Sequence, residues 1–172
     1  MDQIRSMVRQ LLAKAKINTP PVEVEKVAKQ QKVKVKFAAL EGNISGLLFR
    51  KQGRAVIGVN ALHPPVRQRF TLAHELGHFL LGHRGDFFLD RVILFRDSKS
   101  QEGTHEEEIS ANRFAAELLM PEDMVRKELK NHSIELDDEE AVEKLAAKFR
   151  VSTQAMTIRL QYLGRVSIGD EF

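Results

Sequence analysis

The strongest constraint on the fold is the segment His74-Glu75-Leu76-Gly77-His78, which places two histidines four residues apart. His63-Pro64-Pro65 closes the preceding element, and the chain from Val66 to about Leu81 has the pattern of a helix. Gly82 follows at the position of a C-terminal cap. Four residues make about one helical turn, so both imidazoles leave one face and can share a cation. The segment predicts a helix that carries two metal-ligand candidates.

The residue types in this segment favour hydrolytic zinc chemistry. Zinc accepts neutral imidazole nitrogen and prefers a tetrahedral shell. Glu75 follows the first histidine, and a carboxylate there can take a proton from water whose pKa a metal lowers to about 7. The chain has no cysteine, so any metal must be held by His, Asp or Glu. Two His and a carboxylate also accept manganese or iron. The alternative is that both histidines are exposed or hydrogen-bonded and that Glu75 is an ordinary surface residue.

His83 does not supply the third ligand in this interpretation. It comes five residues after His78, which is about 140° further around the axis of a continued helix. It also misses the extended pattern H-E-x-x-H-x-x-G-x-x-H, because Leu81 and Arg84 occupy the required Gly and His positions. We expect His83 to be a residue of the helix end.

A second helix, over about residues 106–119, is the better source of a third ligand. Its small and apolar residues form a face that a neighbouring helix can approach closely. Glu108 and Asn112 are one turn apart, so a carboxylate could reach the metal while a polar side chain orients a ligand histidine. Spacing alone leaves Glu106 and Glu107 as competitors for the ligand position.

The remaining pattern predicts an α+β fold. The 172 residues suit one domain with a small appendage. Three short strands close together indicate a small, largely antiparallel sheet. The apolar stretch RVILF (91–95) is either a further strand or a tucked loop. The predicted strands span 33–37, 44–51 and 54–60, and the further helices 22–31, 137–149 and 153–163, with one more opening at Pro121; Ser152 caps the helix that starts at 153, and Gly164 ends it.

Two segments resemble the ImmA/IrrE family of zinc-dependent endopeptidases. FTLAHELGHFLLGH (70–83) matches the family's H-E-x-x-H helix, and EEISANRFAAELLMP (107–121) matches its second motif without gaps. The resemblance implies a zincin-like minimal metalloprotease core over residues 1–125, followed by a helical extension over 126–172 packed on that core.

The resemblance also assigns roles to residues. It implies that His74, His78 and Glu108 bind zinc, that Glu75 is the general base, and that Asn112 orients a ligand. Family members cleave helix-turn-helix repressors of mobile elements or stress responses and so release transcription. The substrate backbone is expected to lie along the sheet edge as an added strand. His105 and Tyr162 are candidates to stabilise the oxyanion, although no motif supports either.

The C-terminal segment 145–164 resembles a helix-turn-helix. Its second helix would offer Thr153, Gln154, Thr157 and Arg159 to base edges. However, Arg150 stands where a glycine usually makes the turn, and the preceding ELDDEEAVE is acidic, whereas phosphate contacts need Lys and Arg. We therefore favour a helical pair that packs on the core. The alternative function is a DNA-binding or repressor-sequestering antirepressor with a structural metal.

Charge and hydropathy limit the compartments in which we expect the protein. Residues 1–70 contain 14 Lys and Arg against four Asp and Glu, which is either a functional basic patch or, more commonly, a solvated face. Residues 4–15 form an amphipathic pattern, read as a helix docked on the core rather than a membrane anchor or transit peptide. No apolar run approaches the roughly 18–20 residues of a membrane span. We expect a cytoplasmic protein with a protein substrate and no membrane partner.

Overall fold

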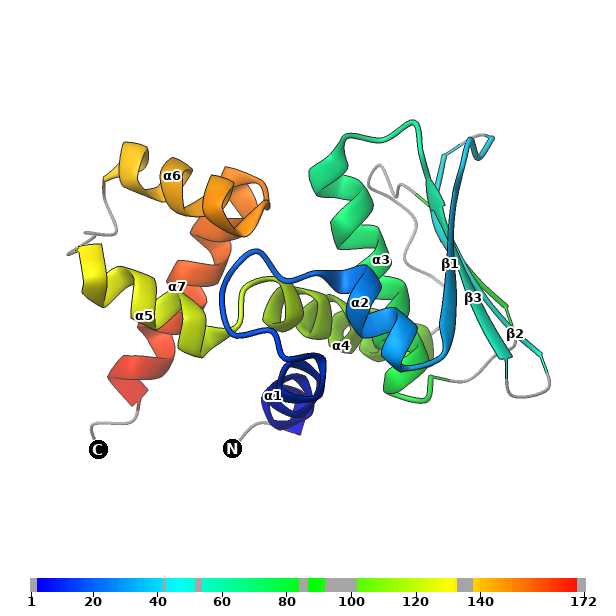
Figure 1. The fold of residues 1–172 in the computed structure, drawn as a ribbon, viewed down its shortest axis with the longest axis horizontal. Helices are drawn as coiled ribbons and strands as arrows, with labels where there is room; N and C mark the ends of the chain where they lie inside the picture. The colour runs from blue at the N-terminus through cyan, green and yellow to red at the C-terminus, as the bar shows by residue number, and fades with distance from the viewer. Residues whose placement is uncertain are drawn as a thin grey trace. The chain divides into compact units, whose positions relative to one another are not determined.

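The computed structural model describes residues 3–41, 43–51, 54–83, 87–91, 102–132 and 138–169. Seven helices and four strands lie in these ranges (Figure 1). In chain order they are α1 (Gln3–Ala15), α2 (Val24–Gln30), β1 (Val33–Ala38), β2 (Ile44–Lys51), β3 (Arg54–Asn60), α3 (Pro65–Leu80), β4 (Phe87–Arg91), α4 (Glu102–Leu119), α5 (Glu122–His132), α6 (Glu139–Phe149) and α7 (Thr153–Gly169).

The chain divides into two compact units. One consists of residues 23–115, and the other combines residues 1–22 with 116–172. The boundary falls inside α4, so this helix begins in the first unit and ends in the second. In this division α1 groups with the C-terminal helices. The metal-site candidates all lie in the unit of residues 23–115.

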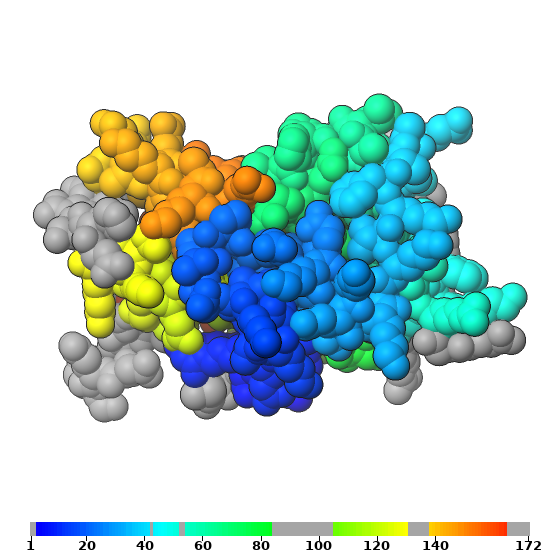
Figure 2. All heavy atoms as spheres, in the orientation of Figure 1, coloured from blue at the N-terminus to red at the C-terminus, as the bar shows by residue number. Residues whose placement is uncertain are grey.

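The sheet of that unit is mixed and has the order β1-β3-β2-β4. β1 pairs with β3 in parallel, whereas β2 pairs with β3 and with β4 in antiparallel fashion. Leu48 of β2 lies opposite Ile57 of β3, and both side chains are fully buried. Because side chains alternate along a strand, this register defines the face of the sheet that is turned to the core. α2 and β1 lie at the surface of the side drawn in Figure 2.

Helix α3 is the centre of this unit. Pro65 stands at its first turn, where the missing N–H has no helical partner to lose. Every residue from Thr71 to His78 is buried, which is the mark of a helix covered on more than one side. α3 contacts β2 and β3 as well as α2. At Gly77 it also approaches α4, since a Cβ added there would lie 3.2 Å from the carbonyl oxygen of Ala111.

The three predicted strands are confirmed, but the prediction of a three-stranded sheet is wrong. β4 adds a fourth strand, and the pairing of β1 with β3 is parallel. The expected candidate RVILF shares only Arg91 with β4, and its residues 92–95 lie outside the described part of the chain. β4 pairs with β2, so the position of this strand depends on a partner far away in the sequence.

In the other unit, α1 buries one stripe, formed by Ile4, Val8, Leu11, Leu12 and Ala15, as its periodicity predicted. Arg5 and Arg9 flank this stripe and are partly exposed. Arg9 forms a two-pronged ion pair with Asp123, at 2.7 Å from Nε and 2.6 Å from the terminal nitrogen. Arg5 contacts Glu122 at 2.7 Å. Both acids open α5, where negative charge also favours the helix terminus.

Helices α6 and α7 contact each other and are joined by a short turn. Arg150 makes the turn in the left-handed conformation, with φ 53°, although it is not a glycine. Ser152 Oγ accepts a hydrogen bond from Ala155 N, which confirms the predicted cap. Gly164 does not end α7, which continues to Gly169, because glycine inside a helix costs only about 1 kcal/mol. None of the helices over the described ranges is long and apolar enough to cross a membrane.

Candidate metal centre

The two histidines of α3 point in one direction, and Glu75 points in another. Their burial is almost complete: His74 is 4% exposed, Glu75 1% and His78 2%. His74 Nδ1 lies 3.0 Å from Asn112 Oδ1 of α4. Glu75 faces β2, since its Oε1 lies 3.3 Å from the position that a Cβ on Gly46 would take. The helix thus directs imidazole toward α4 and carboxylate toward the sheet.

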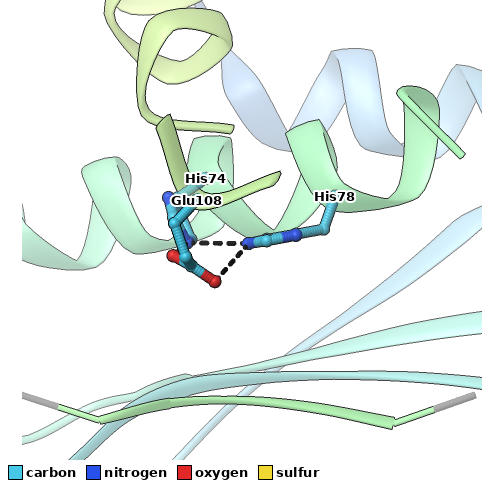
Figure 3. Close-up of side chains that lie close together, drawn as sticks. All are labelled: His74, His78 and Glu108. Atoms are coloured by element: carbon cyan, nitrogen blue, oxygen red, sulfur yellow. Dashed lines mark hydrogen bonds and ion pairs between the residues drawn. The ribbon is translucent and has the colours of Figure 1, made fainter. Parts of the chain in front are cut away.

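Glu108 of α4 completes a cluster with the two histidines (Figure 3). Its two carboxylate oxygens lie 3.2 Å from His74 Nε2 and 3.2 Å from His78 Nε2. The two Nε2 atoms are 3.0 Å apart. Among the described residues, the potential ligands within 4.8 Å of one another are His74, His78 and Glu108. The cluster contains neither Glu106 nor Glu107, so the alternatives that spacing left open are decided in favour of Glu108.

The donor set fits a small divalent cation. Asn112 Oδ1 can only accept a hydrogen bond, so the proton of His74 lies on Nδ1 and its Nε2 carries a lone pair. This lone pair faces Nε2 of His78 and one carboxylate oxygen of Glu108, and a positive charge stabilises acceptor atoms that lie this close together. Zinc bonds of about 2.0–2.1 Å in a tetrahedron separate ligand atoms by about 3.3 Å. The observed 3.0 and 3.2 Å are close to that separation.

Charge and exposure differ across the cluster. Burial alone would raise the pKa of the Glu108 carboxyl, but its contacts with His74 and His78 outweigh burial and hold that pKa far below its ordinary value. The carboxylate is therefore ionised at neutral pH, as a metal ligand must be. The Glu108 side chain is 49% exposed, whereas the His74 and His78 side chains are 5% and 2% exposed. The histidines of the cluster are therefore shielded from solvent, whereas the Glu108 side chain is accessible to it.

Asn112 lies against His74, one of the two candidate ligand histidines. The contact between its Oδ1 and His74 Nδ1 joins α4 to α3 one turn after Glu108. The same helix therefore supplies the carboxylate of the cluster and the acceptor that orients a histidine. This one-turn spacing on α4 was the signal that the sequence offered.

His83 follows the end of α3 and is not a member of the cluster, as expected, but its side chain lies against His78. His83 Nδ1 lies 2.8 Å from His78 Nδ1, and His83 Nε2 lies 3.0 Å from Ser110 Oγ. The 140° argument assumed that the helix continues to residue 83. Instead Gly82 takes φ 71°, and His83 N donates to His78 O at 3.2 Å. In this Schellman arrangement the residue after the glycine turns back onto the residue five positions earlier.

The environment of His83 favours the neutral ring. The side chain is buried, and burial is the main cause that lowers its pKa; the neighbouring His78 lowers it further. The signal that could have revealed this contact was Gly82 itself, because a Schellman glycine brings together the residues at its two sides. Ser110 carried no comparable signal.

The other candidates for chemistry are not members of this cluster. His105 is exposed on α4, and Glu106 is exposed beside it. Tyr162 belongs to the other unit, where the Arg159 guanidinium lies 5.9 Å from the centre of its ring. Arg159 itself is buried, which contradicts its role as a base-contacting residue, whereas Thr153, Gln154 and Thr157 are exposed.

Comparison with known proteins agrees with the geometry of the cluster. A peptidase family model described as the IrrE N-terminal-like domain matches residues 28–161. The chain is 36% identical over 74 residues to the radiation response metalloprotease IrrE of Deinococcus radiodurans, an alignment over 43% of this chain and 22% of that protein. It is 30% identical over 136 residues to uncharacterized immunity region protein 2 of Bacillus phage phi105, over 78% of each.

A solved structure shares the fold. A Mycobacterium tuberculosis transcriptional regulator superposes with a TM-score of 0.64 at 16% identity, covering 93% of this chain and 47% of that one. The chain thus spans about a fifth of the IrrE protein and about half of the regulator. The family model covers both motif helices and most of the chain. This chain belongs to the ImmA/IrrE family of peptidases.

Proposed function

We propose that this chain is a metal-dependent endopeptidase in which His74, His78 and Glu108 hold zinc. The observation that carries the proposal is the convergence of the Glu108 carboxylate with the two Nε2 atoms of α3, a helix whose Glu75 is also buried. Three protein ligands leave a zinc position open, which is the arrangement of catalytic sites. The donor set also accommodates manganese.

The residues of the chain divide the chemistry among them. When bound, the metal supplies Lewis acidity, which lowers the pKa of water and polarises the scissile carbonyl. The Glu75 carboxylate takes the proton of the attacking water and passes it to the leaving amine. Asn112 holds His74 with its Nε2 toward the ion. The exposed side of Glu108 is the route by which substrate and water reach the site.

The proposed substrate is a helix-turn-helix repressor of mobile-element or stress-response genes, cut in the cytoplasm so that transcription is released. The similarity to a phage immunity region protein and to a radiation response metalloprotease supports this substrate class. β4 is an edge of the described sheet, so an extended substrate segment can add to it as a further strand.

The test is co-expression with the repressor encoded beside the gene, followed by mass spectrometry of the fragments. The wild type should cut the repressor at one site, and Glu75→Gln should keep the metal and lose the cleavage. Cleavage by Glu75→Gln at the wild-type rate would disprove the role of Glu75 as base. Loss of repression without fragments in both proteins would instead indicate sequestration.

We propose that the α6–α7 pair does not read DNA. Arg159 is buried against Glu117 and the Met120 carbonyl, so the second helix loses its one basic candidate. The first turn of α6 is acidic through Glu139 and Glu140. A gel-shift titration at low salt should show no binding of duplex DNA. Binding that weakens steeply with salt would favour the antirepressor alternative.

A further inference from the structure

We propose that His83 is a positioning residue that holds His78 in the tautomer presenting Nε2 to the metal, and that Ser110 holds His83 in turn. This inference rests on the proposed metal site and extends it to residues outside the ligand set. Two contacts support it directly: 2.8 Å between the Nδ1 atoms of His78 and His83, and 3.0 Å between His83 Nε2 and Ser110 Oγ.

The direction of each hydrogen bond follows from the position of the ligand atom. If His78 binds a metal through Nε2, its neutral ring carries the proton on Nδ1. That N–H can donate only to a lone pair, so the Nδ1 of His83 must be the acceptor and its proton must lie on Nε2. His83 Nε2–H then donates to Ser110 Oγ, and the hydroxyl of Ser110 donates to the Glu107 carbonyl at 3.0 Å. The protons of the three side chains are thereby assigned.

The end of α3 explains why His83 can reach His78. Gly82 takes φ 71°, a conformation that other residues rarely adopt, and among the described residues other than its two chain neighbours no atom lies within 4 Å of a Cβ added there. The backbone N–H of His83 donates to the carbonyl of His78, so main chain and side chain of the pair are in contact. The two imidazole rings pack edge to face, and their ring centres are 4.9 Å apart. His83, which lies beyond the end of α3, thus supports the position of the His78 side chain within the helix.

The two ligand histidines are then oriented by different devices on α4. His74 uses the amide oxygen of Asn112, whereas His78 uses an imidazole that depends on the hydroxyl of Ser110. Ser110 and Asn112 are two residues apart and flank the small residue Ala111, which lies against Gly77 of α3. The same close helix contact therefore determines the position of both orienting groups.

The test uses variants of the full chain that separate hydrogen bonding from packing. His83→Phe keeps an aromatic ring without an acceptor, and His83→Asn returns an acceptor oxygen near the former Nδ1. Ser110→Ala removes the partner of His83. His63→Asn is the matched control, because His63 precedes α3 and its Nδ1 makes no hydrogen bond in the described structure.

The first readout needs no metal. Two-bond proton–nitrogen correlations of the metal-free protein at about pH 8, above the ordinary histidine pKa, report the tautomer of each imidazole. We expect Nδ1–H for His78 in the wild type, in His83→Asn and in His63→Asn, and its loss in His83→Phe. A wild-type His78 protonated on Nε2, or an unchanged tautomer in His83→Phe, would overturn the inference.

The second readout is zinc affinity by chelator competition, with the visible spectrum of the Co²⁺-loaded protein as a probe of ligand geometry. His83→Phe should bind zinc about 10–100-fold more weakly, as expected when a group that orients a ligand is lost. The zinc affinity of His83→Asn should lie closer to that of the wild type. Ser110→Ala should lower the affinity, but less than His83→Phe does. The affinity of His63→Asn should equal that of the wild type. Equal affinity of wild type and His83→Phe would contradict the inference. A wild type that binds zinc but cuts no repressor would overturn the proposed function alone.

Discussion

Gly77 and Phe114 lie against each other where α3 and α4 come closest: a Cβ on Gly77 would be 3.0 Å from Phe114 Cδ1. The same Cβ would be 3.3 Å from the Cα of Ala111, so backbone as well as side chain limits the space. Gly77 is one of the two unspecified positions of the H-E-x-x-H pattern. Its lack of a side chain lets α4 bring Glu108 and Asn112 to the histidines.

Gly77→Ala is therefore expected to weaken both stability and the metal site. Alanine gains up to about 1 kcal/mol of helix propensity, but overpacking of a core costs typically about 1–3 kcal/mol. We expect a net loss of about 1 kcal/mol in denaturant unfolding and weaker zinc binding by chelator competition. Unchanged zinc affinity would show that the helix spacing does not control the cluster.

Gly46→Ala should be more damaging, because its Cβ would lie 2.4 Å from Thr71 Cγ2 and 3.3 Å from Glu75 Oε1. Both neighbours belong to the buried part of α3. We expect a loss of about 1–3 kcal/mol in the free energy of unfolding. The double variant with Thr71→Ser, which lacks Cγ2, should recover part of that loss. No recovery would mean that the strain lies in the strand backbone rather than in this contact.

Zinc should stabilise the folded chain through the three-residue cluster. A ligand at 100 times its Kd adds about 2.7 kcal/mol to the free energy of unfolding, and a chelator should remove this increment. Glu108→Gln should lose most of the increment, whereas Glu106→Gln, an exposed neighbour on the same helix, should keep it. Equal zinc-dependent shifts in thermal scans of the two variants would argue against Glu108 as a ligand.

Asp123 should make stability depend on acid pH. Hydrogen bonds from Arg9 lower its pKa, burial opposes them, and Arg5 adds to the lowering. An acid with a lowered pKa in the folded state stabilises fully above its unfolded pKa of about 3.9, and this stabilisation is lost as pH falls toward the folded value.

The Asp123 side chain is 52% exposed, so solvent screening keeps this contribution small. We expect Asp123→Asn to cost about 0.5–1 kcal/mol at neutral pH. The gap between wild type and variant should close as urea unfolding is repeated at falling pH below 4. A gap that is constant with pH would assign the loss to packing instead of charge.

Arg159 is expected to be a structural residue rather than a DNA contact. Its guanidinium pairs with buried Glu117 and donates to the Met120 carbonyl at 3.0 Å. Arg159→Ala would leave the Glu117 carboxylate buried with its ion pair broken, at a cost of about 3–5 kcal/mol. Exposed Gln154→Ala should stay within about 0.5 kcal/mol of the wild type in the same unfolding measurement. Equal stability of the two variants would refute a structural role for the buried pair.

Much of the fold could be predicted because its signals are local. The bounds of β2 and β3 follow from alternation and turn residues, and Ser152 caps α7 as expected. β4 could not be placed, because its position depends on pairing with a distant strand. The end of α7 was placed too early, because the cost of Gly164 in a helix is small compared with the stabilisation that packing gives elsewhere along it.

The sequence by itself determined the chemistry of the site. Two histidines one turn apart share a face wherever that helix packs, because helix geometry is independent of context, and a glutamate directly follows the first of them. Only the tertiary structure decided which acid joins them. Glu106, Glu107 and Glu108 differ by about 100° around α4, and the contact of Gly77 with Ala111 and Phe114 sets the rotation that points Glu108 at the histidines. The contact of His83 with His78 likewise depends on the turn at Gly82. Because Gly82 has a left-handed backbone conformation, the chain leaves the helix there, and the position of His83 cannot be read from helical periodicity.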